Sequence, residues 1–204
     1  LEPDLLTDSL IRYMARSRAF MPHFHIPLQS GSDNVLRLMH RRYDTALFAD
    51  KIRLIKSVMP HAFIGVDVIV GSRGETAEEF EKSYEFIKSL DVSQLHVFPY
   101  SERPGTAALS IPHVVSDGDK KVRSQRLLDL SDAKTESFYA QHVGSCREVL
   151  FENNTGGRVA RGYTDNYIRV EASVSDASSL DNQIRRVRLT GLTHSRHAMK
   201  CELL

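Results

Sequence analysis

The first two thirds of the chain alternate short apolar runs with stretches of helical periodicity. The longest run, residues 63–70, is interrupted only by Gly65 and Asp67 and is typical of a buried strand. Shorter runs at residues 24–28 and 94–98 predict two more strands. Helical periodicity fills the segments between these runs.

Four helices are expected in this part of the chain. Residues 45–59 place apolar side chains on one helical face, and Pro60 ends the pattern. Residues 76–90 open with Thr76 and Glu79 at the spacing of a capping box. Weaker patterns predict helices at residues 7–15 and 33–41. Strands that alternate with helices in this order predict a parallel sheet with right-handed crossovers.

The pattern changes after a long, charged helix expected at residues 119–142, with Gly144 as its stop. Short strands with alternating polarity follow, at residues 147–151, 167–172, 186–189 and 199–203. Turn residues separate them, at Gly156-Gly157, Asp165-Asn166, Asp181-Asn182 and Gly191. The sequence therefore predicts two domains, residues 1–144 and a small antiparallel β-barrel at residues 145–204.

Composition adds few constraints. The apolar fraction is 41% and the charged fraction 26%, as in an ordinary soluble globular protein. No apolar run is long enough for a membrane span, and acidic residues occupy the place of a signal peptide's basic region. The two cysteines, Cys146 and Cys201, fit neither a disulfide framework nor a metal motif. We therefore expect a cytoplasmic protein without a membrane partner.

Polar loops follow all three predicted strands of the first domain, where α/β proteins hold ligands. Gln29 and Ser30 follow the first strand, Glu75 the second, and Tyr100 and Arg103 the third. Each loop also has an ordinary structural explanation, because polar residues there also cap helices or form surface turns.

Asp67 is the one charged residue within the apolar run at residues 63–70. A buried carboxylate is costly unless it is paired. Asp67 is therefore expected either to meet a buried partner or to contact a ligand.

Three motifs occur together in one order: HIPLQSGSD from His25, IGVDVIVGSRGET from Ile64 and LHVFPYSERPGT from Leu95. In this order they resemble the radical S-adenosylmethionine (SAM) methylthiotransferases. The segment GYTDNYIRVEA from Gly162 resembles the TRAM RNA-binding domain of these enzymes. The resemblance implies an α/β fold that forms the C-terminal half of a partial (β/α)6 TIM-like barrel, followed by a small OB-like antiparallel β-barrel.

The family binds S-adenosylmethionine and two 4Fe-4S clusters, and both sets of cluster cysteines are missing from this chain. Leu1-Glu2-Pro3 matches the end of the third barrel strand of the family. The resemblance thus implies an inactive fragment without metal ligands of its own. The full-length enzyme would use a tRNA anticodon stem-loop as substrate, with a sulfur donor and a flavodoxin-like electron donor.

The resemblance also assigns candidate site residues, although it leaves the catalytic residues unassigned. The expected cofactor-binding residues are Gln29, Ser30, Asp67, Ile69, Glu75, Phe98 and Tyr100. The expected RNA-binding residues are Arg103, Arg158, Arg161, Tyr163, Tyr167, Arg169, Arg186 and Arg188. For the arginines of the β domain, a solvated strand face is the alternative. Ser72-Arg73 depart from the Phe-Pro pair that is usual in the family.

The expected function is part of a tRNA methylthiotransferase, which adds a 2-methylthio group to a modified adenosine next to the anticodon. N6-threonylcarbamoyladenosine is the favoured substrate. The alternatives are isopentenyl-adenosine in tRNA, an aspartate of a ribosomal protein, or a different radical SAM reaction on the same barrel. A non-catalytic RNA-binding module is the alternative outside enzymes.

Overall fold

The computed structural model describes residues 1–152 and 157–204, so Gly156 of the predicted Gly156-Gly157 turn lies outside the described residues. The chain forms two compact units, which are treated separately below. The first comprises residues 1–17, 24–60 and 64–132, and the second residues 18–23, 61–63 and 133–204.

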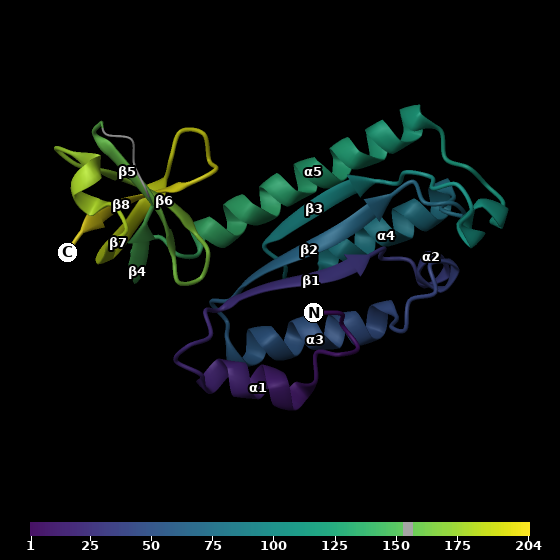
Figure 1. Cartoon of the computed structure of the whole chain (residues 1–204), viewed down its shortest axis with the longest axis horizontal. Coiled ribbons are helices and arrows are strands. Elements are labelled where there is room, and N and C mark those ends of the chain that lie inside the picture. The colour runs from purple at the N-terminus through teal and green to yellow at the C-terminus, as the bar shows by residue number, and fades with distance from the viewer. Residues whose placement is uncertain (153–156) are drawn as a thin grey trace. The chain divides into compact units, whose positions relative to one another are not determined.

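The first unit is built on a three-stranded sheet of β1 (His23–Gln29), β2 (Phe63–Val70) and β3 (Gln94–Pro99), in the order β1-β2-β3. The arrows of the three strands point the same way in Figure 1, and β2 and β3 pair in parallel. This confirms an α/β fold with a parallel sheet. That the sheet is half of a (β/α)6 barrel stays a prediction.

The helices are α1 (Asp8–Arg16), α2 (Asp33–Leu38), α3 (Thr45–Val58), α4 (Ala77–Ser89) and α5 (Asp117–Ala140), with a short 3-10 helix η1 (Ala107–Ser110). The first four share one N-cap geometry, in which a side-chain oxygen accepts a hydrogen bond from the N–H three residues on. These caps are Thr7, Ser32, Asp44 and Thr76. The cap reading of Ser32 is therefore confirmed.

Two details of the predicted helices are wrong. The predicted helix at residues 33–41 ends at Leu38, and His40 adopts a left-handed conformation with φ 55°. The capping box at Thr76 is only half formed. Thr76 Oγ1 accepts from the N–H of Glu79, but the Glu79 carboxylate binds Ser32, Asn34 and Lys82 instead.

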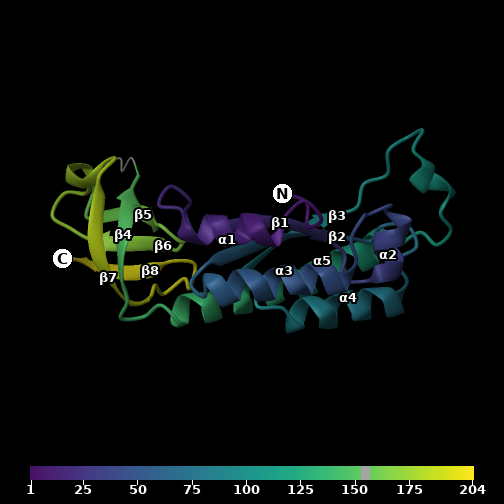
Figure 2. The same cartoon turned by 90° about the horizontal axis from the view of Figure 1, so that it is seen from below.

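The two faces of the sheet differ in polarity. One face is apolar and buried, with residues such as Ile26, Val66, Val68 and Leu95. Figure 2 shows α3, α4 and α5 on one side of the sheet. Along β2, the burial pattern alternates from Val66 onward, so Asp67 and Ile69 on the opposite face are only half-buried. That open face carries the candidate site.

Within the part of the chain that the structure describes, no helix has the length and apolar character needed to cross a membrane.

The second unit contains a closed five-stranded barrel. Its strands are β4 (Cys146–Phe151), β5 (Val159–Thr164), β6 (Arg169–Ser173), β7 (Ile184–Leu192) and β8 (Met199–Leu203), with a 3-10 helix η2 (Ala177–Leu180). The order around the barrel is β4-β5-β6-β8-β7. A barrel was predicted, but β6 and β8 pair in parallel, so the expectation of a purely antiparallel barrel is wrong. Five strands in a closed ring cannot all alternate in direction, so one neighbouring pair must be parallel.

The predicted strands also missed β5, which contains Gly162 and few large apolar residues. The close approach of β4 explains the glycine. A Cβ at position 162 would lie 2.3 Å from the carbonyl oxygen of Leu150. Gly162, which helps to hide β5 in the sequence, is therefore required by the packing of β5 against β4.

The barrel core predicts a large difference between two adjacent residues of β4. Phe151 is fully buried in the core, whereas Leu150 is 47% exposed. Phe151→Ala should cost about 3–5 kcal/mol of unfolding free energy, because it removes a large side chain from a closed core. Leu150→Ala should cost less than about 1 kcal/mol. Urea unfolding of the whole chain, followed by circular dichroism, measures both. Equal costs would contradict the assigned direction of the two side chains.

Candidate functional site

The open face of the sheet carries three titratable side chains in one row, each from a different strand. His25 lies on β1, Asp67 on β2 and His96 on β3, and Asp67 pairs with His96 in the register of β2 and β3. The His25 Nε2 atom lies 2.6 Å from Asp67 Oδ1. The imidazole rings of His25 and His96 stack, with centroids 4.8 Å apart and 6° between their planes.

The contacts of Asp67 bear on the two alternatives expected from the sequence, a paired carboxylate or a contact to a ligand. Its side chain is 22% exposed and is paired with His25, so both a partner and access to a ligand are present. His96 is half-buried, and burial, together with the neighbouring His25, lowers the pKa of His96, against the opposing effect of Asp67. Neither histidine was singled out from the sequence. The feature that could have identified them is the alternation of side chains along each strand, which places both histidines on the same sheet face as Asp67.

A pocket of about 390 Å³ lies next to this row, toward the carboxyl ends of the strands. Ile69 and Phe98 form its floor on adjacent strands, and Tyr100, Arg103 and Thr106 line it from the loop after β3. Phe98 is 51% exposed. The pocket therefore offers an apolar surface next to a polar loop.

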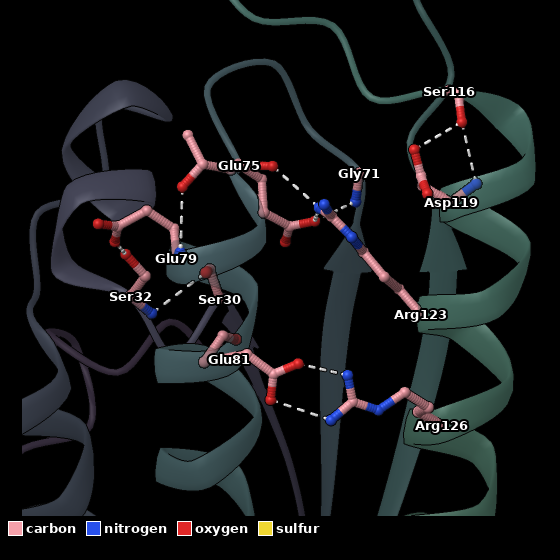
Figure 3. Close-up of polar contacts among 12 residues, drawn as sticks. Ser30, Ser32, Gly71, Glu75, Glu79, Glu81, Ser116, Asp119, Arg123 and Arg126 are labelled. Atoms are coloured by element: carbon pink, nitrogen blue, oxygen red, sulfur yellow. Dashed lines mark hydrogen bonds and ion pairs between the residues drawn. The ribbon is translucent and has the colours of Figure 1, made fainter.

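The loop after β1 is held by Glu79 of α4 (Figure 3). The Glu79 carboxylate accepts hydrogen bonds from Ser32 Oγ and, at 3.0 Å, from Asn34 Nδ2. Hydrogen bonds from Ser32, Asn34 and Lys82 lower the pKa of Glu79 from 4.5 to about 2. One carboxylate on the helix after β2 thus fixes the polar loop that follows β1.

The loop after β2 is held by a buried ion pair between Glu75 and Arg123 of α5 (Figure 3). Arg123 Nη1 donates to Glu75 Oε2 at 2.8 Å and to the Glu75 carbonyl oxygen at 2.9 Å. The same carboxylate oxygen accepts from the N–H of Gly71 at 2.7 Å. Burial raises the pKa of Glu75, while Arg123 and Gly71 oppose that shift.

Arg73 fastens the loop after β3 to the loop after β2. Its Nε lies 2.7 Å from Glu102 Oε1, and its Nη1 donates to the carbonyl oxygens of Leu109 at 2.7 Å and Ile111 at 3.3 Å. The pairing with Glu102 raises the pKa of Arg73. Arg73 is one of the two residues that depart from the family pattern, and the structure gives it a definite role.

The expected cofactor-binding residues fall into two groups. Asp67, Ile69 and Phe98 lie on the open face, and Tyr100 lies at its edge. Three others are buried, namely Gln29 at the end of β1 and Ser30 and Glu75 in the loops. The Ser30 hydroxyl accepts from the N–H of Ser32, and the Glu75 carboxylate is engaged as described above. The contacts of Ser30 and Glu75 therefore support the loops themselves.

The expected RNA-binding arginines of the barrel are all exposed. Arg186 and Arg188 project from β7 on either side of the buried Val187. Arg161 pairs with Glu171 of the neighbouring strand at 3.1 Å. Arg158 precedes β5, and Arg169 opens β6. β7 carries three exposed arginines, of which Arg186 and Arg188 are expected RNA-binding residues.

The two expected tyrosines form a column of stacked rings with His23 within the second unit. Tyr167 stacks on His23 with centroids 4.1 Å apart and on Tyr163 with centroids 4.9 Å apart. The turn that presents Tyr167, with φ 64°, is fixed by the buried Asn166, which bonds to His142 Nε2 and to the carbonyl oxygen of His61. Both faces of the Tyr167 ring are covered, so a base could stack on it only by displacing a neighbour.

The thiols of this chain do not fit an iron-sulfur cluster, which is held by several thiolates. The two cysteines lie on different strands of the barrel, with Cys146 exposed and Cys201 buried. Burial raises the pKa of the Cys201 thiol to about 11, which disfavours the thiolate. Within residues 1–152 and 157–204, no three His, Cys, Asp or Glu side chains are placed to hold a metal ion.

Comparison with known proteins places the fold of this chain in one class. Residues 2–87 match the radical SAM superfamily. A solved radical SAM enzyme, coproporphyrinogen III oxidase (HemN) from Escherichia coli, aligns with a TM-score of 0.51 and 20% identity over 69% of this chain and 31% of that chain. At that identity the likeness shows the fold alone.

Curated relatives narrow the class. The chain is 40% identical to the threonylcarbamoyladenosine tRNA methylthiotransferase MtaB of Bacillus subtilis, over 83% of this chain and 39% of the relative. The MtaB of Rickettsia prowazekii is 34% identical over 98% of this chain and 45% of that protein. The tRNA-2-methylthio-N(6)-dimethylallyladenosine synthase of Thermobifida fusca is 39% identical over 76% of this chain and 31% of that protein. The chain belongs to the radical SAM tRNA methylthiotransferase family, and it spans less than half the length of these relatives.

The Glu79 contacts predict a specific dependence of stability on pH. A carboxyl whose pKa falls on folding contributes stability above its ordinary value of 4.5, and this contribution is lost as the pH falls from about 4.5 toward 2. Glu79→Gln should therefore cost about 1–3 kcal/mol at pH 7 and almost nothing near pH 2. Urea unfolding at a series of pH values measures the difference. The matched control is Glu85→Gln, an exposed glutamate of the same helix that pairs with Lys88 at 3.4 Å. A cost for Glu79→Gln no larger than for this control at pH 7 would refute the assignment.

Proposed function

We propose that this chain is part of a radical SAM methylthiotransferase that adds a 2-methylthio group to N6-threonylcarbamoyladenosine next to the anticodon of tRNA. The observation that carries the proposal is the 40% identity to the MtaB of Bacillus subtilis over 174 residues. Relatives named for dimethylallyladenosine match at 36% over 70% and at 39% over 76% of this chain, so they favour a second, weaker candidate substrate.

In this proposal, the open sheet face and its pocket form one wall of the cofactor and substrate site. Ile69 and Phe98 offer the apolar surface on which an adenine ring packs. Gln29 and Tyr100 flank that surface at the carboxyl ends of β1 and β3. S-adenosylmethionine supplies the radical chemistry, and the clusters of the full-length enzyme are bound by residues outside this chain.

The second unit would serve as a TRAM-like module that binds the anticodon stem-loop. Arg186 and Arg188 are exposed on one strand and have no ion pair among the described residues. Such side chains are suited to phosphate contacts. A sulfur donor and a flavodoxin-like electron donor complete the proposal for the full-length enzyme, which would act in the cytoplasm.

The first test is complementation. The full-length protein that contains this chain, expressed in a Bacillus subtilis strain lacking its MtaB, should restore 2-methylthio-N6-threonylcarbamoyladenosine in digested tRNA, as detected by mass spectrometry. The present chain alone should restore none, because its two thiols do not fit a cluster. Absence of the product with the full-length protein would refute the proposed substrate. Reconstitution of the chain alone with iron and sulfide should give no stoichiometric cluster absorption, and appearance of that absorption would refute its inactivity.

The second test addresses RNA binding by the chain itself. Its affinity for an anticodon stem-loop RNA should fall with added salt, because phosphate contacts release counterions. Arg186→Gln combined with Arg188→Gln should weaken binding and reduce the slope of log K against log salt by about one to two. The control is Arg53→Gln, an exposed arginine of α3 that pairs with Asp50. An unchanged slope in the double variant would exclude this strand as the phosphate-binding surface.

A further inference from the structure

The outer surface of the barrel carries a row of large apolar side chains that crosses three neighbouring strands. Ile184 of β7 lies opposite Leu150 of β4 in the strand register. Leu150 in turn lies opposite Tyr163 of β5. Residues directly opposite each other share one face of a sheet, with Cβ atoms about 4.5–5.5 Å apart. The three side chains therefore form one continuous surface, the apolar row.

The apolar row is open to solvent. Ile184 is 61% exposed and Leu150 is 47% exposed, whereas their strand neighbours Phe151 and Val187 are fully buried in the barrel core. Single apolar side chains scattered over a surface need no explanation, but adjoining ones mark a candidate binding surface. Covering them with a ligand would remove apolar area from water, which favours binding.

An arginine bounds the apolar row at each end. Arg169 of β6 lies opposite Tyr163. Arg186 follows Ile184 by two positions on β7, so it shares the face of the row. Both arginines are exposed, and neither has an ion pair within residues 1–152 and 157–204, although Glu148 lies opposite Arg186 in the register. Cations at both ends suit a ligand that carries repeated negative charges.

Tyr163 is a fixed part of this surface. Its ring stacks on Tyr167 with 21° between the two planes, and Tyr167 is held by His23 on its other face. The orientation of the Tyr163 ring is thus set by neighbours within the second unit. A side chain that is already ordered loses little conformational entropy when a ligand packs against it.

Single-stranded RNA matches the chemistry of this surface. Unpaired bases expose faces that stack on aromatic rings or pack on apolar side chains, and the phosphates beside them bind arginines. A duplex buries its base faces and presents its charged backbone, which gains nothing from Leu150 or Ile184. From Ile184 to Arg169 the surface spans three strand spacings, or about 14 Å. Sheets of RNA-recognition modules stack about two or three bases over such a surface.

We propose that the apolar row binds about two or three unpaired bases of an RNA loop, while Arg169 and Arg186 contact the phosphates beside them. This inference rests on the proposed RNA-binding role of the second unit. It adds the residues that meet the bases, Leu150 and Ile184 among them, and it assigns single-stranded RNA as the ligand.

The experiment measures binding of the whole chain to an anticodon stem-loop RNA over a series of salt concentrations. Leu150→Thr combined with Ile184→Thr should lower the affinity by about ten- to a hundredfold, because the packing surface for the bases is lost. The slope of log K against log salt should stay unchanged, because no phosphate contact is removed. Leu150→Phe keeps a packing surface and should keep the wild-type affinity.

A change in the RNA provides an independent measurement. A stem-loop with abasic loop nucleotides should bind the wild-type chain about as weakly as the intact stem-loop binds the double threonine variant. The double variant should lose little further affinity for the abasic RNA, because the two changes remove the same contact. Leu128→Ser, which changes an exposed leucine of α5, is the matched control and should leave the affinity unchanged.

The possible failures are distinguishable. If the stem-loop binds with the expected salt dependence but equally well to the wild-type chain and the double threonine variant, the inference fails while the RNA-binding role stands. That result would assign the apolar row to a protein contact instead. A double variant that lowers the salt slope together with the affinity would also overturn the inference. If the wild-type chain binds no stem-loop RNA, the proposed role of the second unit itself fails.

Discussion

The buried ion pair between Glu75 and Arg123 is the interaction on which the first unit depends most. It joins the loop after β2 to α5, and the Glu75 carboxylate also accepts from the N–H of Gly71. A buried carboxylate is tolerated only when such partners replace its water, so removal of either charge leaves the other uncompensated. The glycine loop after β2 relies on this pair. Glu75 was expected from the sequence to contact a ligand. In the structure, its carboxylate holds the loop after β2 in shape.

Local signals in the sequence were sufficient for much of the fold. The strand at residues 63–70 was predicted with its observed bounds, because a long apolar run between a helix-ending proline and a glycine has few other interpretations. The cap at Ser32 was also foreseeable from local chemistry. The missed features are long-range. Glu79 binds Ser32, 47 positions away, and the parallel pairing of β6 with β8 follows from closing a ring of five strands.

The candidate site shows the same limit. Asp67 stood out in the sequence because a charge interrupts an apolar run, but its partners could not be read from that run. His25 and His96 come from other strands and reach Asp67 only through the register of the sheet. In the barrel, Tyr167 was predicted from the sequence to bind RNA, and that role stays a prediction. Its covered faces became evident only once His23, a residue distant in sequence, was placed beside it.

Arg73 limits how this protein can be recombined with its relatives. Its guanidinium bonds to Glu102 and to two carbonyl oxygens near Leu109 and Ile111, so one loop carries the fastening for another. The family resemblance implies a Phe-Pro pair at these positions in relatives, and such relatives would lack that guanidinium. A chimera that exchanges only residues 101–111 would strand Arg73 without its acceptors, or leave a foreign loop without its anchor. The loops after β2 and β3 depend on each other structurally, so they should be exchanged together.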